Sequence, residues 1–375
     1  MRERSRILLR IDVSIVLKRL LSPCDDGCYW EFNRFATEAA PYNRLGSLLL
    51  PHHSFRLLLA LLACLPGLAE AQTFPAKPVK WIVPFPPGGP TDSFSRPVAQ
   101  KLSELLGQPV VVENIAGAGA AIGTDRLAKS PPDGYTVALA TTGTHSINPH
   151  LYGARLQYDA LKDFTPLTLA VKYTNVLVVH PAVAAKNVGE LVAFAKANPG
   201  KVTFGSAGNG SSNHLSGEVL KHVTGAPMQH VPYKGSAAAL TDVVAGNITF
   251  MFDILVTSIP QVRAGRVRAL AVTSTSRSPH APEIPTMAES GIKGYSEAGA
   301  DLWFGIVAPA GLPKAVTTKL NEKLIEAMRS PDIRQRISAQ MFELWTSTPE
   351  EFARVVRTDH EKWGRIVKAS GAKVD

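Results

Sequence analysis

The sequence predicts an α/β protein made of two doubly wound lobes, and three observations lead to this fold class. Short β-rich runs alternate with helical runs along most of the chain, a pattern typical of parallel sheets flanked by helices. The chain has 375 residues, of which 45% are hydrophobic, so it can build two domains with real cores. A strand that ends in Val-Pro-aromatic and then opens a helix occurs at residues 83–85 and again at 231–233.

The first 71 residues are expected to stand apart from the folded unit. Arg56 precedes an apolar stretch at 57–68, and the small-x-small site Ala69-Glu70-Ala71 follows it. This order predicts a secretory signal peptide at 51–71, because the stretch is too short to span a bilayer. Residues 1–50 are interpreted as a non-native or unstructured extension. Lipid anchoring at Cys64 is the alternative to simple cleavage.

Composition and motifs exclude several function classes. The net charge is +9, but no basic run interleaves with aromatic residues, so nucleic acid is not an expected partner. A mild positive field favours small anions. All three cysteines precede residue 72, and the chain lacks Gly-x-Ser-x-Gly and His-Glu-x-x-His. Residues 117–123 miss the dinucleotide spacing by one position. We therefore expect no catalytic residue, metal or cofactor.

The first lobe is expected at residues 72–173 and 296–375. Its strands are predicted at 79–83, 110–113, 135–140 and 164–170. Its first helices are predicted at 92–106 and from the glycine-rich 117–123 to Lys129. A strand at 303–307 returns to this lobe, and helices at 314–329, 331–339 and 349–368 close it. Thr348, Pro349 and two acidic residues form a typical helix start.

The second lobe is expected at residues 174–295, after a crossing near 172–175. Its strands are predicted at 176–179, 202–204, 229–231, 248–252 and 267–272. Its helices are predicted at 188–197, 212–223 and 237–244. Two such lobes bury a small ligand in the cleft between them and close by a hinge.

The strand–turn–helix at residues 79–92 is the most informative motif. Gly88 and Gly89 allow close backbone approach, and Pro90 suits the first turn of a helix. Backbone N–H groups at a positive helix end can hold a carboxylate or phosphate, and the loop has no lysine and so is no P-loop. Residues 231–236 repeat the motif, with Lys234 as an added charge or a solvated surface lysine.

Three further segments carry candidate ligand donors. Residues 204–215 form a turn rich in glycine and serine, where His214 is expected to brace the loop. Residues 141–149 follow a strand and offer Thr141, Thr142 and Thr144 as donors, with His145 in a structural role. Asp253 ends a strand and could accept from a ligand amine or orient a loop donor.

Taken in their order along the chain, these motifs make the sequence resemble the tripartite tricarboxylate transporter substrate-binding proteins, the Bug family of periplasmic receptors. The resemblance spans residues 74–374. It rests on the segments 83–92, 113–119, 144–149, 158–164, 204–215, 230–236, 282–286 and 303–309. Two positions depart from the family's pattern: one fewer glycine follows Gly119, and Phe252-Asp253 replaces a commoner Asp-Asn pair.

The resemblance implies a type II periplasmic-binding fold, with the ligand cleft between the two lobes, and no catalysis. It implies a receptor that binds a small carboxylate and delivers it to a two-component integral membrane permease, without stable membrane insertion of its own. A secreted enzyme or a ligand sensor on the same fold is the alternative. The implied ligand-binding residues are Phe85, Pro87, Gly88, Gly89, Thr91, Asp92, Thr141, Thr142, Thr144, His145, Ser206, Ala207, Gly208, Gly210, Ser211, Tyr233, Lys234, Gly235 and Asp253.

Overall fold

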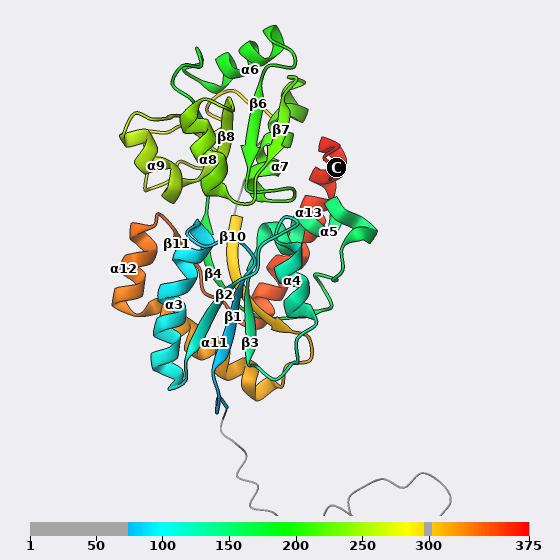
Figure 1. Cartoon of the computed structure of the whole chain (residues 1–375), viewed down its shortest axis with the longest axis vertical. Helices are drawn as coiled ribbons and strands as arrows, with labels where there is room; N and C mark the ends of the chain where they lie inside the picture. The colour runs from blue at the N-terminus through cyan, green and yellow to red at the C-terminus, as the bar shows by residue number, and fades with distance from the viewer. Residues whose placement is uncertain (1–73, 296–301, 375) are drawn as a thin grey trace, which may run out of the picture. The chain divides into compact units, whose positions relative to one another are not determined.

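The computed structural model describes residues 74–295 and 302–374, and it contains two β-sheets (Figure 1). The signal peptide and the extension that precedes it lie outside the described residues. The first sheet, in lobe 1, has the order β11-β4-β10-β3-β1-β2. Its strands are β1 (Val79–Val83), β2 (Val110–Asn114), β3 (Thr136–Thr141), β4 (Phe164–Tyr173), β10 (Leu302–Pro309) and β11 (Glu343–Leu344). The expected α/β class with two lobes is confirmed.

The second sheet, in lobe 2, has the order β7-β6-β8-β5-β9. Its strands are β5 (Asn175–Val179), β6 (Thr203–Ser206), β7 (Gln229–Pro232), β8 (Phe250–Ile254) and β9 (Arg268–Val272). Only Thr174 separates β4 from β5, so the chain passes between the two sheets almost without a loop.

The expected parallel pairing holds for β1 with β2 and β3 and for β6 with β7 and β8, but each sheet also contains antiparallel pairs and is therefore mixed. β10 is antiparallel to β3 and β4, and β5 is antiparallel to β8 and β9. β5 and β10 are the strands by which the chain enters each sheet from the other lobe. The parallel strands end at the edge that faces the other lobe. A strand that arrives there starts at that edge and must run the opposite way.

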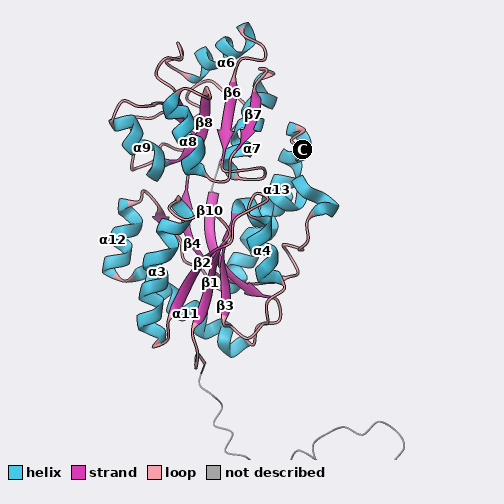
Figure 2. Cartoon of the chain, viewed as in Figure 1, coloured by secondary structure: helices cyan, strands magenta, loops and turns pink. Residues whose placement is uncertain are grey.

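Helices cover both faces of each sheet (Figure 2). In lobe 1 they are α3 (Pro90–Leu106), α4 (Ala121–Ala128), α5 (Asn148–Tyr152), α11 (Lys314–Arg329), α12 (Pro331–Ala339) and α13 (Pro349–Ser370). In lobe 2 they are α6 (Val188–Ala197), α7 (Ser212–Thr224), α8 (Ser236–Ala245) and α9 (Leu255–Arg263). The sequence pattern did not anticipate α5 or α9. Each carries an internal or early proline that disguised its period.

The start of α13 shows how local sequence sets these boundaries. The Thr348 hydroxyl accepts from the Glu351 N–H at 3.2 Å, and the Glu351 carboxylate accepts from the Thr348 N–H at 2.9 Å. This reciprocal capping box satisfies two backbone donors that a helix start leaves free. Pro349 occupies the first helical position, where no N–H is needed.

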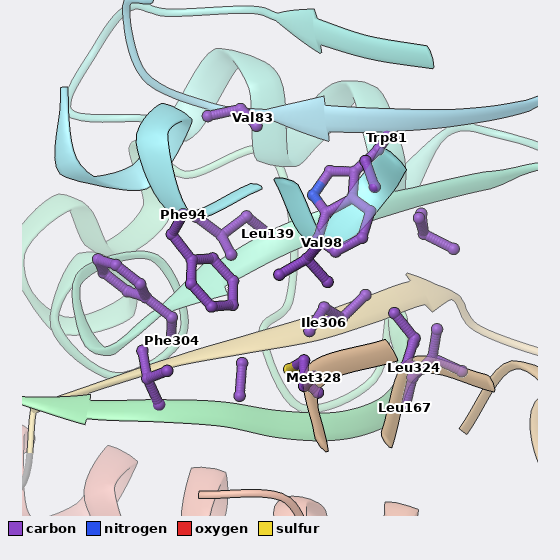
Figure 3. Packing of buried hydrophobic residues seen from close by; sticks show 14 of the residues in the cluster. Trp81, Val83, Phe94, Val98, Leu139, Leu167, Phe304, Ile306, Leu324 and Met328 are labelled. Atoms are coloured by element: carbon purple, nitrogen blue, oxygen red, sulfur yellow. The ribbon is translucent and has the colours of Figure 1, made fainter. Parts of the chain in front are cut away.

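Alternation along the strands divides the apolar core of lobe 1 into two layers. Trp81 and Leu139 pack with α3 and α11 on one face, as Figure 3 shows, whereas Ile82 and Ala138 pack with α4 and α13 on the other. On β10, Phe304 and its neighbour Trp303 divide in the same way. Both faces are buried, so these strands have near-continuous apolar sequences.

Lobe 2 repeats this construction. One face of its sheet packs on α6 and α7 around Phe204 and Phe250, and the other packs on α8 and α9 around Met251 and Leu240. The carboxyl ends of its parallel strands β6, β7 and β8 lead into the starts of α7, α8 and α9. In open α/β sheets, ligands bind outside these strand ends.

Candidate functional site

A cavity of about 260 Å³ lies where loops of the two lobes meet. The residues that line it come from both sheets' strand ends and from the helix starts that follow them. They are Phe85, Pro86, Pro87, Gly89, Pro90, Thr91, Thr141, Gly143, Tyr173, Ala207, Ser211, Ser212, Asn213, Lys234, Gly235, Ser236, Ala237, Ala238, Ile254 and Phe304.

Three helices begin at the wall of this cavity. Pro90 and Thr91 open α3, Ser212 and Asn213 open α7, and residues 236–238 open α8. The first-turn N–H groups of a helix have no partner four residues earlier, and the helix dipole adds positive potential there. The combined starts therefore form a donor-rich, electropositive wall without requiring many charged side chains.

The start of α8 is the most open of the three. Its cap, Gly235, provides no side-chain hydrogen bond, and the Ala239 N–H is the donor that reaches the Gly235 carbonyl, at 3.5 Å. The N–H groups of Ser236, Ala237 and Ala238 come before that bond, at helix positions that have no hydrogen-bond partner within the helix. Ala237 and Ala238 are exposed and carry only methyl groups, so a small anion can reach the backbone beside them.

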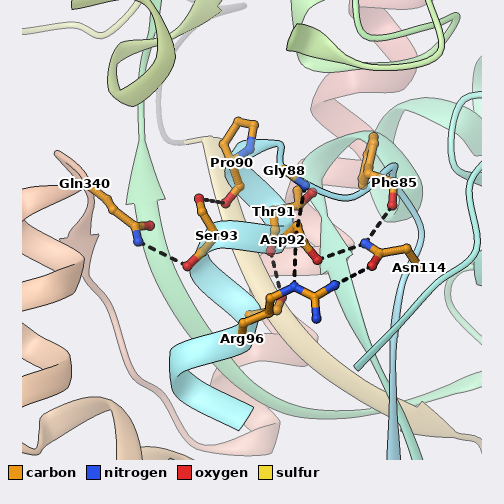
Figure 4. A network of polar contacts seen from close by, with 10 residues as sticks. Phe85, Gly88, Pro90, Thr91, Asp92, Ser93, Arg96, Asn114 and Gln340 are labelled. Atoms are coloured by element: carbon orange, nitrogen blue, oxygen red, sulfur yellow. Dashed lines mark hydrogen bonds and ion pairs between the residues drawn. The ribbon is translucent and has the colours of Figure 1, made fainter. Parts of the chain in front are cut away.

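Hydrogen bonds from the Asp92 carboxylate hold the first loop in shape (Figure 4). Asp92 Oδ2 accepts from the Gly88 N–H at 3.0 Å and from Arg96 Nε at 2.9 Å, and Oδ1 accepts from Asn114 Nδ2 at 2.9 Å. Asn114 Nδ2 also donates to the Phe85 carbonyl at 3.0 Å. Burial raises the pKa of Asp92, but the donors from Arg96, Gly88 and Asn114 outweigh it and hold the pKa below the usual value.

The loop of lobe 2 that precedes α7 is braced from below by a histidine. His214 Nδ1 accepts from the Gly210 N–H at 3.2 Å, which requires a neutral ring with its proton on Nε2. Burial, with the neighbouring His230 ring, lowers the pKa of His214 to about 2. The Ser211 hydroxyl donates to the Gly208 carbonyl at 2.7 Å, and Ser206 Oγ accepts from the Gly208 N–H at 3.1 Å. His214 thus makes the bracing contact expected from its position.

Asp253 acts behind the cavity wall. Its carboxylate accepts hydrogen bonds from the hydroxyls of Ser236, Thr257 and Ser258. Burial raises the pKa of Asp253, and these hydroxyl donors lower it only in part. Through Ser236, the first residue of α8, Asp253 positions the helix start that faces the cavity.

The floor of the cavity is aromatic. Tyr173 and Phe304 lie with ring centroids 4.7 Å apart, and Phe304 also contacts Phe94 at 5.9 Å and Phe342 at 5.5 Å. The Tyr173 hydroxyl lies 3.3 Å from Ser212 Oγ in lobe 2. Burial raises the pKa of Tyr173 to about 12, so it keeps its proton at neutral pH.

Close contacts at three glycines join the lobes beside the cavity. A Cβ on Gly119 of lobe 1 would lie 1.8 Å from the Asn209 carbonyl oxygen of lobe 2. A Cβ on Gly210 would lie 1.8 Å from Asn148 Oδ1, and one on Gly235 would lie 3.3 Å from Pro86 Cγ. The structure therefore shows the lobes drawn together at these glycines.

The structure brings nine of the implied ligand residues to the cavity wall. They are Phe85, Pro87, Gly89, Thr91, Thr141, Ala207, Ser211, Lys234 and Gly235. The two Val-Pro-aromatic loops thus line the same cavity, one from each lobe. Lys234 is exposed at its edge.

The structure places the other ten implied residues outside the cavity wall. They are Gly88, Asp92, Thr142, Thr144, His145, Ser206, Gly208, Gly210, Tyr233 and Asp253. Gly208 and Tyr233 instead line a neighbouring cavity of about 250 Å³ that shares Phe85, Pro86, Ala207 and Lys234.

Several of these ten have structural partners that account for their position. Thr144 Oγ1 lies 2.8 Å from His145 Nδ1, and the buried His145 ring packs on Phe164 at 4.7 Å. Thr142 Oγ1 accepts from the Trp303 N–H at 3.0 Å, and the Tyr233 hydroxyl donates to Asp242 at 2.6 Å.

Reasoning from the sequence missed the apolar half of the wall. Tyr173 ends the crossing strand β4, Phe304 lies near the start of the returning strand β10, and Ile254 ends β8. Only Ile254 had a usable signal, since it follows Asp253 at a strand end. Asn213 could have been read from the same serine-rich turn as Ser211.

Among the described residues, none of the helices has the length and apolar character needed to cross a membrane.

Comparisons with known proteins identify the family. Residues 94–372 match the model of the tripartite tricarboxylate transporter family receptor. The chain is 38% identical to the protein BugT of Bordetella pertussis over 309 residues, covering 81% of this chain and 93% of BugT.

Two solved structures extend the similarity to the fold. The R. palustris protein Rpa4515 with adipate is 34% identical, with a TM-score of 0.75, and covers 80% of this chain and 98% of its own. MatC from Rhodopseudomonas palustris with bound malate is 30% identical, with a TM-score of 0.74, and covers 78% and 100%. This chain therefore belongs to the tripartite tricarboxylate transporter family of receptors and is a homologue of the Bug proteins.

Proposed function

We propose that this protein is a periplasmic receptor that binds a small carboxylate in the cavity between its lobes. The observation that carries the proposal is the meeting of three helix starts at one cavity wall. Backbone N–H groups at helix starts favour anions, and a carboxylate can accept from several of them at once. The relatives solved with adipate and malate support the same ligand class.

The proposed ligand contacts divide between the two lobes. Thr91 and the α3 start would hold the anion from lobe 1, and residues 235–238 with Ser212 and Asn213 would hold it from lobe 2. Lys234 adds positive charge at the edge. A ligand that contacts both lobes favours the arrangement in which they are drawn together, by its differential affinity for that state.

We propose binding without catalysis. Ser211 and His214 lie in one loop, but the Ser211 hydroxyl donates to the Gly208 carbonyl, and His214 Nδ1 accepts from the Gly210 N–H. Neither atom is directed at the other, so the pair does not have the geometry of a nucleophile and its base. Asp253 is fully buried behind Ser236 and does not line the cavity, so its carboxylate is not placed to act as a base on a ligand there.

Delivery to a two-component membrane permease, and export to the periplasm through the signal peptide at 51–71, complete the proposal. The family match supports both. Expression together with the permease in a strain that lacks its own uptake system tests delivery, since uptake of labelled ligand should need both parts. Uptake that is unchanged without the receptor would contradict this role.

A thermal-shift panel of matched pairs tests the ligand class. Each carboxylate is compared with its primary amide and its alcohol, so that only the anionic group changes. A carboxylate at 100 times its Kd stabilises the folded state by about 2.7 kcal/mol, or roughly 5 °C in Tm for a chain of this size. If amides and alcohols raise the Tm as much as acids do, the proposed ligand class is wrong.

A further inference from the structure

The cavity wall has two chemically different parts. The polar part consists of helix starts, and the apolar part is formed by Phe85, Tyr173, Ile254 and Phe304 with prolines and alanines around them. Tyr173, Ile254 and Phe304 are each less than a tenth exposed. An anion held at the helix starts would therefore extend any remaining part of the molecule over a water-poor, largely aromatic surface.

Most polar side chains in the wall are already committed to protein partners. The Ser211 hydroxyl donates to the Gly208 carbonyl, and Asn213 Nδ2 donates to the Phe252 carbonyl at 2.8 Å. The Ser236 hydroxyl donates to Asp253, and Ser212 Oγ accepts from Asn175 Nδ2 at 3.3 Å. These groups shape the wall and leave few side-chain donors for a second polar end of a ligand.

The charge in the wall matches one anionic group. Of the described residues that line the cavity, Lys234 alone carries a formal charge, and no arginine or histidine is among them. With the first carboxylate held jointly by the helix starts, a second one at the far end of the ligand would face the aromatic floor. Removing an ion from water without a compensating partner costs several kcal/mol. This desolvation cost exceeds the favourable contact energy between a carboxylate and the aromatic rings of the floor.

The volume agrees with a ring-bearing ligand. A dry apolar cavity of about 150 Å³ accepts benzene. The 260 Å³ here leaves roughly 100 Å³ for a carboxylate and a short linker. The floor is also fixed in place, because Phe304 is held by ring contacts to Phe94, Tyr173 and Phe342. A rigid wall of this kind binds without first losing side-chain freedom.

We infer that the ligand is a monocarboxylate with an apolar, ring-bearing body, such as an arylalkanoate, rather than a dicarboxylate. The inference rests on the proposed function and narrows its ligand class. The carboxylate lies at the starts of α3, α7 and α8. The ring lies on Tyr173 and Phe304, with Phe85 and Ile254 beside it. This preference differs from the dicarboxylates bound by the R. palustris relatives.

Isothermal titration calorimetry of the purified mature chain tests the inference with five probes. 3-Phenylpropanoate tests the ring, hexanoate tests an apolar chain, and adipate is hexanoate with a second carboxylate. Malate is a short dicarboxylate, and 3-phenylpropanol lacks the anionic group. We expect 3-phenylpropanoate to bind at least tenfold more tightly than adipate or malate, about 1.4 kcal/mol, and hexanoate to bind more tightly than adipate.

The outcomes separate this inference from the proposed function. If adipate or malate binds as tightly as 3-phenylpropanoate or more so, the inference is overturned and the carboxylate receptor stands. If 3-phenylpropanol binds as tightly as 3-phenylpropanoate, or if none of the four acids binds, both proposals fail.

A variant pair locates the ring in the cavity. Phe85→Leu removes an aromatic wall, whereas Phe74→Leu makes the same change at a partly buried phenylalanine outside the cavity. We expect Phe85→Leu to weaken 3-phenylpropanoate binding about tenfold and hexanoate binding less than threefold, consistent with the value of an aromatic pair. Equal losses for both ligands, or the same loss in Phe74→Leu, would place the ring elsewhere.

Discussion

Gly119→Ala should block the approach of the two lobes without touching the ligand. Gly119 lies in lobe 1 outside the cavity wall, and its added Cβ would sit 1.8 Å from the Asn209 carbonyl oxygen of lobe 2. Real Cβ contacts are essentially never shorter than 3.0 Å, so the loops must separate by more than 1 Å at this point. Backbone on the opposing side cannot rotate away as a flexible side chain could.

The structure sets the size of the effect. A separation of this size would break two marginal hydrogen bonds between the lobes: Tyr152 hydroxyl to the Asn209 carbonyl at 3.4 Å, and Tyr173 hydroxyl with Ser212 Oγ at 3.3 Å. Each contributes about 1 kcal/mol. Losing both raises the Kd of a ligand that needs the lobes together by about 30-fold.

Gly107→Ala provides the matched control. Gly119 and Gly107 have similar positive φ values of +58° and +67°, but nothing lies within 4 Å of a Cβ on Gly107. Both variants should lose about 1 kcal/mol of unfolding free energy from backbone strain. Gly119→Ala should lose about 2 kcal/mol more with the two hydrogen bonds between the lobes, and so should show the larger fall in Tm. Calorimetric titration with the strongest carboxylate should show weakened binding in Gly119→Ala alone. Unchanged affinity in Gly119→Ala, or an equal loss in Gly107→Ala, would refute the reasoning.

Three further predictions concern stability. Burial lowers the pKa of His145 to about 3 and that of His214, together with the His230 charge, to about 2, both below the usual 6.5. Their stabilisation is therefore complete above pH 6.5 and lost as the pH falls, at about 1.4 kcal/mol per pH unit for each. Urea unfolding measured from pH 7 to 4 should show this loss of unfolding free energy. His214→Asn keeps an acceptor for the Gly210 N–H and should remove about half of the slope of unfolding free energy against pH. An unchanged slope in this variant would contradict the prediction. Burial raises the pKa of Asp253, so its contribution is complete below about pH 3.9 and declines as the pH rises towards the folded pKa. The stability of Asp253→Asn relative to the wild type should therefore increase over that pH range. A difference in unfolding free energy between the two proteins that does not change with pH would contradict this. Gly305→Ala places a Cβ 2.3 Å from the Phe352 ring and should cost about 1–3 kcal/mol in denaturant unfolding; a neutral result would mean that the ring can move.

The fold could be predicted largely from local pattern, apart from strand direction. The bounds of α6, α11 and α12 match the expected ranges, because each has a clear start signal or a steady apolar period. The same alternation of apolar residues fits a strand that runs either way, so the antiparallel β5 and β10 could not be recognised. Their direction depends on which lobe the chain comes from.

The site could be predicted only where backbone chemistry sets it. Glycine and proline around residues 84–91 and 231–236 mark loops that approach a ligand, and both loops line the cavity. Side chains were harder to place. Asp92 and Asp253 look like ligand contacts in the sequence, yet one braces Gly88 and the other holds Ser236. Tyr173 and Phe304 carry no signal of a ligand site in the sequence, and only the crossing of the chain brings them to the cavity.

The most direct test of the carboxylate site compares Ala238→Asp with Ala238→Asn. Ala238 is exposed at the third position of α8 and lines the cavity. An aspartate there suits the helix dipole and should leave apo stability equal or slightly higher. It also places a negative charge beside the proposed anion site, and two like charges at a separation of about 5 Å repel by about 3 kcal/mol at an effective dielectric of 20. We predict that calorimetry of the strongest carboxylate will show more than 100-fold weaker binding to Ala238→Asp than to Ala238→Asn. Equal affinity in the two variants would contradict binding of a carboxylate at these helix starts.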